Sequence, residues 1–336
     1  MDRPGALTPQ DAQRRLIGAV RSFTAQRRAD DPGFADGGVC VGLSGGADSL
    51  ALTAAAVHAG LAVHALVVDH RLQAGSAQAA REAVAQAVGL GAQASILPVT
   101  VHASGEGPEA AARTARYQAL DRAREGRPVL LGHTVDDQAE TVLLGLGRGS
   151  GARSLAGMSP WRAPWARPLL GVRRADTRAA CAGWGLTVWD DPHNLDPRYT
   201  RVRVRTEVLP LLEEVLGGGV AAALARTAGL LQHDAHALDE LAESLLERAR
   251  DGDGLRVTAL QEAPTALRTR ALRAWIAERG GDGAGARTVE QVDALITHWH
   301  GQGPVAIGGD SEARLVVTRR SSVVTVCREP RGTPRG

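Results

Sequence analysis

The stretch that decides the fold runs from residue 39 to residue 49 and reads Val39-Cys40-Val41-Gly42-Leu43-Ser44-Gly45-Gly46-Ala47-Asp48-Ser49. Its apolar first half suits a buried strand, and an alanine-rich helical pattern follows it. Between the two, a pair of glycines lets the backbone approach a ligand, and successive N–H groups at a helix start form a cradle for an anion. Ser44 and Ser49 can donate to phosphate oxygens, and Asp48 is placed to hold Mg²⁺ against them. The stretch therefore predicts a phosphate-binding loop.

Around this loop, short apolar runs alternate with longer helical ones. We expect strands at 39–43, 63–68, 94–99 and 128–131, and helices at 48–58, 76–88 and 108–124. This alternation is typical of right-handed βαβ units and a parallel sheet. Ligands bind such sheets at the carboxyl ends of the strands. The predicted fold class is therefore α/β, with a Rossmann-like parallel sheet.

Polar residues follow two further strands at that edge. One strand ends in Val67-Val68-Asp69-His70, and another leads into Gly132-His133-Thr134-Val135-Asp136-Asp137-Gln138-Ala139-Glu140-Thr141. Asp137 and Glu140 are three residues apart, so they share a helix face. Acids at a helix start can simply complement the helix dipole, but a pair beside a nucleotide loop suits a bound cation. We therefore expect a cation pocket next to the loop.

The second half of the chain is rich in arginine and then becomes helical. The arginines form two clusters, one at 148–178 and one at 198–205, and after the glycines at 217–219 leucines recur at helical spacing. The segment 315–327 is β-branched and strand-like. We divide the chain into an N-terminal helical extension (1–36), a nucleotide-binding domain (37–215), a smaller, mainly helical domain (216–328) and a disordered tail (329–336).

The composition excludes several kinds of mechanism. All 39 basic residues are arginine, which excludes mechanisms that need a protein lysine, such as a Walker A loop or a Schiff base. Cys40, Cys181 and Cys327 form no Cys-x-x-Cys pair, which argues against a disulfide framework or a thiolate metal cluster. No stretch approaches the roughly 20 apolar residues of a membrane span. We expect a cytoplasmic enzyme without a membrane partner, and the oligomeric state stays open.

Taken together, the motifs resemble those of the tRNA(Ile)-lysidine synthetase family. Ser44–Ser49 resembles the PP-loop of the ATP-pyrophosphatase superfamily, which cleaves ATP between its α and β phosphates. The family also shows a Val-Asp-His step, a Gly-His-x-x-Asp-Asp-Gln-x-Glu-Thr segment, an Arg-Gly-x-Gly run and an Arg-Pro-Leu-Leu run. These stand here at 68–70, 132–141, 148–151 and 167–170. The likeness covers about 37–215, and Val202 replaces an asparagine that is usual between the family's arginines.

This resemblance implies a PP-loop ATP-pyrophosphatase domain followed by a tRNA-binding domain, and a two-step reaction. ATP adenylates the wobble cytidine of a tRNA(Ile) with a CAU anticodon and releases pyrophosphate. Free L-lysine then attacks C2, and AMP leaves. The implied ATP contacts are Ser44, Gly45, Gly46, Ala47, Asp48, Ser49, Val67, Val68 and Arg113, with Asp48 on Mg²⁺. The implied lysine contacts are His133, Asp137 and Glu140, the implied tRNA contacts are Arg148, Arg153, Arg201 and Arg203, and the implied catalytic set is Asp48, Asp137, Glu140 and Arg205.

Other readings stay open on these residues. A base thiolase of the same superfamily would be expected to show catalytic or cluster-binding cysteines, which this chain lacks as a suitable pair. A small-molecule PP-loop synthetase would explain the loop but not the arginine-rich second half. A nucleotide-binding module without catalysis would not need the acids at 136, 137 and 140. Which of Asp137 and Glu140 takes the proton of the lysine amine also stays open.

Overall fold

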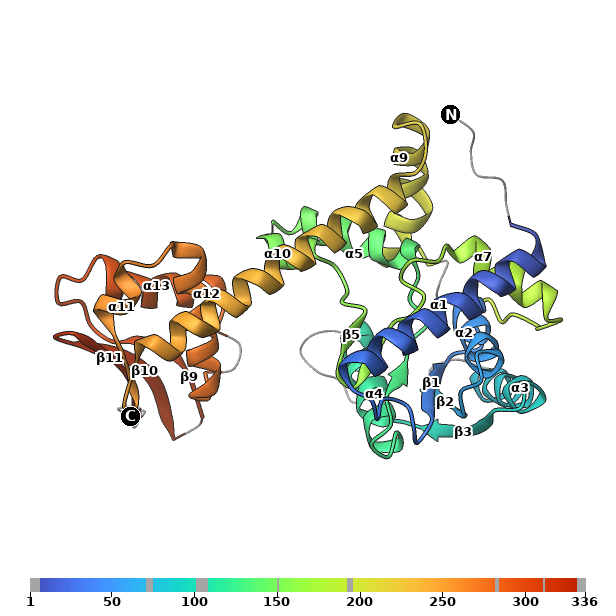
Figure 1. Ribbon diagram of the computed structural model, residues 1–336, viewed down its shortest axis with the longest axis horizontal. Helices are drawn as coiled ribbons and strands as arrows, with labels where there is room; N and C mark the ends of the chain where they lie inside the picture. Colours follow the sequence, from blue (N-terminus) through green and yellow to red (C-terminus); the bar gives the residue numbers. More distant parts are fainter. Residues whose placement is uncertain are drawn as a thin grey trace. The chain divides into compact units, whose positions relative to one another are not determined.

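The computed structural model describes residues 7–70, 75–100, 108–149, 151–191, 196–281, 284–310 and 312–330. The chain divides into two compact units, Met1–Leu231 and Gln232–Gly336. The division falls inside the long helix α10 (Val220–Ala249), whereas the sequence-based division at 215/216 coincides with the end of α9 (Leu209–Val215). Figure 1 shows the elements of each unit in the colours of the sequence.

Within the described residues, the first unit contains a six-stranded sheet of order β3-β2-β1-β4-β6-β5. Its strands are β1 (Val39–Leu43), β2 (Val63–Asp69), β3 (Gln93–Pro98), β4 (Val129–Leu130), β5 (Trp161–Arg162) and β6 (Trp165–Ala166). The β5–β6 pair is antiparallel, and the other pairings are parallel. The four expected strands are thus confirmed with small differences at their ends, and so is the α/β class.

Helices alternate with strands as expected from β1 to α5, and further helices of the first unit precede and follow this part. The helices are α1 (Pro9–Asp30), α2 (Ala47–His58), α3 (Ser76–Gly89), α4 (Pro108–Ala123), α5 (Val135–Gly147), α6 (Gly151–Leu155), α7 (Arg174–Gly183), α8 (Thr200–Arg203), the π-helical turn η2 (Val204–Val208) and α9. The π-turn ends where Leu209 N–H bonds to Val204 O. Pro210, which has no N–H to donate to the preceding turn, follows directly.

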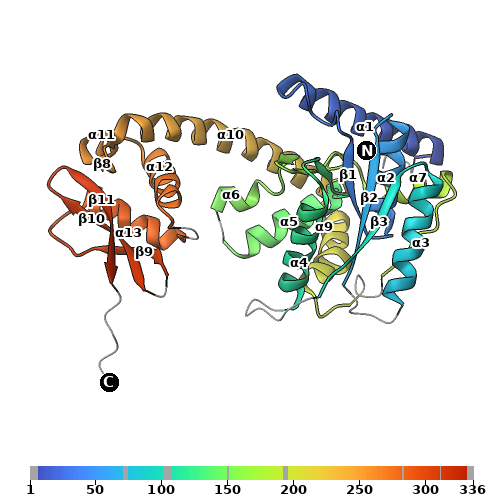
Figure 2. The same cartoon turned by 90° about the horizontal axis from the view of Figure 1, so that it is seen from below.

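The central strand β1 is buried on both faces. Alternate side chains of a strand point to opposite sides of the sheet. All five residues of β1 are buried, so both faces of the sheet are covered here. Val39, Val41 and Leu43 join the core that includes α1, α2, α3 and α7, while Cys40 packs with Leu120 of α4 on the other side. Figure 2 shows these two helical layers on either side of the strands. An unbroken apolar run is the expected signature of such a strand.

The N-terminal helix α1 packs into the same unit. Thr8 caps the helix, and a proline occupies its first turn, where its missing N–H is not needed. Ala12, Leu16 and Val20 recur every four residues and are fully buried. Within the expected N-terminal extension, the described helix α1 is therefore part of the first unit's hydrophobic core.

The second unit is built on a sheet of its own. Among the described residues five strands pair antiparallel in the order β7-β8-β11-β10-β9. They are β7 (Arg250–Asp251), β8 (Gly254–Arg256), β9 (Val305–Gly309), β10 (Ala313–Arg320) and β11 (Val323–Pro330). The helices α11 (Val257–Gln261), α12 (Thr265–Glu278), α13 (Ala286–Thr297) and the end of α10 pack with them around the fully buried Trp275.

This sheet adds to the mainly helical domain expected from sequence. The strand-like segment at 315–327 is a hairpin, because the chain turns at Ser321, which has a φ of +52°. Strands of two or three residues such as β7 and β8 are too short to show a period in sequence. The tail expected at 329–336 begins inside β11, and residues 331–336 lie outside the described residues.

Across the described part of the chain, no single helix is long and apolar enough to cross a membrane. The two segments Thr200–Val215 and Val220–Ala249, which meet at a bend of 97°, reach that length and apolar content only when they are counted together.

Candidate active site

The phosphate-binding loop joins β1 to α2 and is held by its own serines. Ser44 N–H donates to Ser49 Oγ, and the two hydroxyl oxygens lie 3.1 Å apart. Ser49 Oγ donates in turn to Gly46 O at 3.0 Å. Gly45 has a φ of +83°, in the region that favours glycine. Because Gly46 has no side chain to cap α2, the first N–H groups of this helix are available to an anion.

The end of β4 approaches this loop closely at Gly132. A Cβ there would lie 2.8 Å from Asp48 O and 3.0 Å from Ser49 N. Only glycine permits so close an approach of two backbones. This contact holds the segment that carries His133 and Asp137 against the loop.

A cavity of about 470 Å³ opens where these segments meet. It is lined by Gly42, Ser44, Gly46, Ala47, Asp48, Ser49, Arg116, Leu131, Gly132, His133, Asp137, Arg174, Arg178, Trp189, Asp190, Asp191, Arg205 and Thr206. A second cavity of about 260 Å³ shares Ser44, Arg116, Trp189 and Asp191 with it. It is also lined by Val67, Val68, Asp69 and His70. The carboxyl ends of β1, β2 and β4 thus meet at one site, as expected for a parallel sheet.

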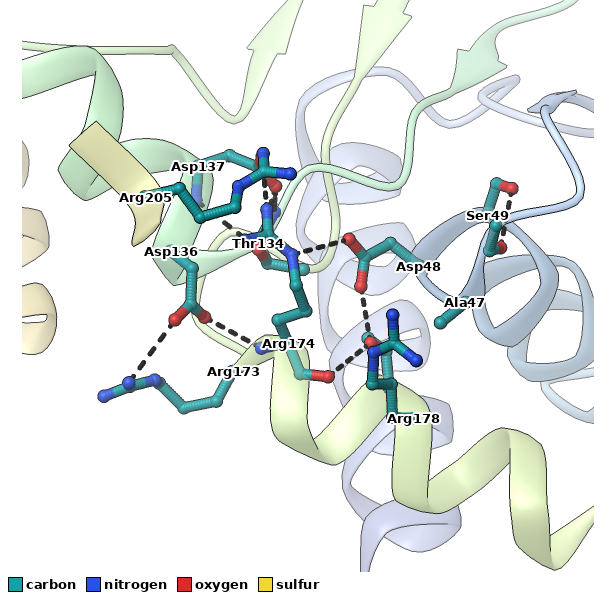
Figure 3. Close-up of polar contacts among 12 residues, drawn as sticks. Ala47, Asp48, Ser49, Thr134, Asp136, Asp137, Arg173, Arg174, Arg178 and Arg205 are labelled. Carbon is teal, nitrogen blue, oxygen red and sulfur yellow. Dashed lines mark hydrogen bonds and ion pairs between the residues drawn. The ribbon is translucent and has the colours of Figure 1, made fainter. Parts of the chain in front are cut away.

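Asp137 has two distinct sets of partners. Thr134 donates to Asp137 Oδ2 from its N–H and its hydroxyl, both at 2.8 Å, which makes a capping box at the start of α5. Arg174 Nη2 donates to Asp137 Oδ1 at 2.7 Å. Figure 3 shows Arg174 reaching Asp137 and Asp48 from the start of α7.

Glu140 is fully buried and surrounded by arginines. Its Oε1 accepts from Arg205 Nε at 2.7 Å and Arg174 Nη1 at 3.2 Å. Its Oε2 accepts from Arg201 Nε at 2.8 Å and Arg205 Nη2 at 3.1 Å. A buried carboxylate needs such partners, and here three guanidinium groups supply them. Glu140 therefore anchors the arginines of α7, α8 and η2 to α5.

The protonation of the site follows from burial and these contacts. Burial raises the pKa of Asp48 above its ordinary value, although Arg174 and Thr177 act in the opposite direction. For Asp137, burial is outweighed by Arg174 and by the Thr134 hydrogen bonds, so its pKa is lowered. Burial also lowers the pKa of His133 to about 3, and its Nδ1 is buried without a hydrogen-bond partner among the described residues. At neutral pH His133 is uncharged and Asp137 is an anion.

Most of the expected ATP and lysine residues come together. Ser44, Gly46, Ala47, Asp48, Ser49, His133, Asp137 and Arg205 line the larger cavity, and Val67 and Val68 line the smaller one. Gly45 belongs to the loop but lines neither cavity. Glu140 is fully buried and also lines neither cavity. Arg113 lies over the Tyr117 ring, 5.1 Å from its centroid, and donates to Tyr117 Oη at 3.4 Å, outside the lining of both cavities.

The four arginines expected on tRNA lie in different surroundings. Arg148 and Arg153 are exposed, and Arg203 is exposed and paired with Glu207 at 2.8 Å. Arg201 instead turns inward to Glu140 and donates to Asp137 O at 3.3 Å. The inward position of Arg201 therefore does not support its expected contact with tRNA.

Sequence reasoning missed Arg174 and Thr177, which both contact Asp48. Thr177 donates its hydroxyl to Asp48 Oδ1, and Arg174 Nε donates to Asp48 Oδ2 at 3.2 Å. Arg174 was visible in sequence as one of many arginines at 148–178. The available signal was that several buried acids require buried bases, but sequence does not show which arginine supplies them.

Comparisons with known proteins identify the family of both units. A PP-loop domain model matches residues 19–212, and a model described as the TilS substrate binding domain matches residues 255–322. The tRNA(Ile)-lysidine synthase of Rhodococcus erythropolis is 61% identical over 84% of this chain and 87% of its own length. Those of Nocardia farcinica and Mycolicibacterium paratuberculosis are 56% and 54% identical, over 94% and 98% of this chain and 99% of their own lengths.

A solved structure shows a similar fold at low sequence identity. The U34-tRNA thiolase NcsA from Methanococcus maripaludis superposes with a TM-score of 0.53 at 18% identity, over 67% of this chain and 80% of its own. At that identity the likeness concerns the fold alone.

Proposed function

This chain belongs to the tRNA(Ile)-lysidine synthase family of ATP-dependent ligases, and on that premise we propose how its residues divide the substrates among them. The PP-loop domain binds ATP. We place the β and γ phosphates at Ser44–Ser49, where the serine hydroxyls and the α2 N-terminus meet the larger cavity. Adenine goes to the smaller cavity, against the backbone of Val67 and Val68.

The residues around Asp48 suit one particular kind of magnesium site. Within the described residues, no group of three or more His, Cys, Asp or Glu side chains is arranged to hold a metal ion. Mg²⁺ in nucleotide enzymes is commonly held by one or two carboxylates together with substrate phosphates and water. Asp48, which lines the cavity beside the loop, fits that role. Bound there, the ion would neutralise charge on the departing pyrophosphate.

The structure favours different roles for Asp137 and Glu140. Both oxygens of Glu140 accept hydrogen bonds from guanidinium groups, and its side chain has no exposed surface. Asp137 lines the cavity with 11% of its side chain exposed. We therefore assign one ammonium group of the free lysine to Asp137, with the neutral His133 beside it. Glu140 then acts through the arginines that it positions, Arg205 among them.

The lowered pKa of Asp137 has a chemical consequence. A carboxylate that is more acidic than usual holds an ammonium ion well but accepts a proton poorly. Asp137 thus binds and orients lysine, while Arg205 lies close enough to the same cavity to contact phosphate. In the proposed reaction, cytidine O2 attacks the α-phosphorus and pyrophosphate leaves. The ε-ammonium group of lysine gives a proton to solvent water, and the resulting amine forms the C2–N bond as the C2–O bond breaks and AMP leaves.

For the tRNA we propose the exposed arginines of the first unit. Arg148, Arg153 and Arg203 are exposed, and phosphate contacts by such residues supply most of the affinity for RNA without reading its sequence.

The observation that carries the proposal is that one cavity joins the PP-loop to the carboxylate of Asp137. The test is incorporation of radiolabelled lysine into a tRNA(Ile) transcript with a CAU anticodon in the presence of ATP. The matched control is the same transcript with uridine at the wobble position. Label in the first transcript and none in the second is expected. Equal labelling of both, or labelling without ATP, would refute the assignment.

A further inference from the structure

One guanidinium group occupies the space between the three carboxylates of the site. Arg174 Nη2 lies 2.7 Å from Asp137 Oδ1, and its Nε and Nη1 lie 3.2 Å from Asp48 Oδ2 and from Glu140 Oε1. Figure 3 shows this side chain between Asp48 and Asp137, with Arg178 on the other side of Asp48. Asp48 lies on α2, and Asp137 and Glu140 lie on α5. Arg174 of α7 joins the two helices through these carboxylates.

The network is electrically balanced as it stands. Its charged members are the carboxylates Asp48, Asp137 and Glu140 and the guanidinium groups Arg174, Arg201 and Arg205. A substrate ammonium ion that enters beside Asp137 adds a fourth positive charge among side chains that are largely buried. Like charges at such a distance repel strongly when they are shielded from water. Displacement of one guanidinium group from its carboxylates restores the balance when a cation binds.

Arg174 is the member placed to leave. Arg201 and Arg205 stand on α8 and η2 and reach only Glu140 and Asp137 among the three carboxylates, whereas Arg174 also contacts the phosphate loop through Asp48. Its backbone N–H is fixed to Asp136 Oδ2 at 2.8 Å, so the helix start stays in place while the side chain turns. With 20% of the side chain exposed, it turns within a cavity that also contains the loop.

We propose that Arg174 is the resident counter-ion of the substrate-cation site, and that nucleotide binding frees this site by drawing the guanidinium from Asp137 to the phosphates. This inference rests on the proposed lysine subsite at Asp137. It makes the two substrates thermodynamically coupled: each binds more tightly when the other is present. Such coupling is reciprocal and typically amounts to about 5–150-fold in affinity.

The test measures binding in the absence of tRNA, so that no reaction occurs. Radiolabelled lysine is titrated by equilibrium dialysis, with and without saturating α,β-methylene-ATP, whose α–β bond cannot be cleaved. In the wild type, the analogue should tighten lysine binding by at least about fivefold. In Arg174→Gln, which keeps the side-chain length but lacks the charge, lysine should bind without the analogue, and the analogue should change its Kd by less than about twofold.

A neighbouring arginine provides the matched control. Arg173 is 40% exposed and pairs with Asp136 at 3.3 Å, so Arg173→Gln changes the same residue type one position away and should keep the wild-type coupling. Melting curves establish that each variant is folded. If Arg174→Gln does not fold, Arg174→Lys keeps the charge with a shorter reach, and it should weaken the coupling relative to the wild type.

The outcomes separate this inference from the assignment beneath it. A wild type whose lysine affinity ignores the analogue, or an Arg174→Gln variant that keeps full coupling, overturns the counter-ion role while leaving lysine at the site. Lysine binding to none of the variants overturns both the role and the lysine subsite. In a third arm Mg²⁺ is added alone. If Mg²⁺ but not lysine raises the melting temperature of Arg174→Gln, the exchanged cation is the metal, and the ammonium form of the proposal is wrong.

Discussion

Replacing Glu140 with glutamine tests whether this residue organises the site or binds substrate. Glutamine has nearly the same shape but removes the charge that three guanidinium groups share. It also places an NH₂ group where one carboxylate oxygen accepts hydrogen bonds at 2.7–3.2 Å. Because the side chain is fully buried, water cannot replace the lost partner. Breaking a buried ion pair by removing one member costs about 3–5 kcal/mol.

This loss is large enough to measure by thermal unfolding. For a unit the size of Met1–Leu231, each 1 kcal/mol lowers Tm by about 2–4 °C. Glu140→Gln should therefore lower the melting temperature by roughly 6–20 °C. It should also weaken ATP binding together with lysine binding, since Arg174 and Arg205 lose their anchor. A residue that only bound lysine would leave both the melting temperature and the ATP affinity almost unchanged.

Glu207 of η2 offers a matched control. It also accepts a two-nitrogen contact from an arginine, Arg203, but its side chain is 49% exposed. An exposed pair contributes little to stability, so Glu207→Gln should melt close to the wild type. If Glu140→Gln melts within about 2 °C of Glu207→Gln, the organising role of Glu140 is refuted.

Three further results are expected. Asp48→Asn should lose nearly all lysine incorporation while its melting temperature stays close to that of the wild type, because the amide keeps one oxygen for Thr177 but weakens magnesium binding; near-normal incorporation would remove Asp48 from the chemistry. Arg203→Ala should reduce the slope of log K for tRNA binding against log salt concentration by about 0.7–0.9 per lost phosphate contact. Arg14→Ala, which removes an exposed arginine of α1, should leave this slope unchanged. Equal slopes in the two variants would show that Arg203 does not contact the RNA. His133 has its pKa lowered by burial to about 3, so between pH 6.5 and 3 the unfolded chain takes up a proton that the folded chain does not, and stability falls with pH through that window. His133→Gln should therefore lose less melting temperature than the wild type between pH 7 and 5, and identical pH profiles would contradict the assignment.

Local sequence determined the layout of the first unit and its nucleotide loop. A five-residue apolar run between glycine-containing turns, as at 39–43, is typical of a strand in the middle of a covered sheet, and β1 is such a strand. The Gly-Gly turn at 45–46 follows from backbone geometry alone. The parallel sheet then places the ends of β1, β2 and β4 together, so that Asp48, Val67 and His133 were predictable members of one site.

Only the tertiary structure decided how the charges are paired. Arg174 and Asp48 are 126 positions apart, and Arg201 and Glu140 are 61 apart, and no local period links residues at such separations. An arginine is equally at home on a solvated face or in a buried network, so Arg201 and Arg203 look alike in sequence and yet lie in different environments. The same holds for Asp137 and Glu140: their shared helix face is a local property. Which of them faces the cavity depends on the arginines that α7, α8 and η2 bring to α5.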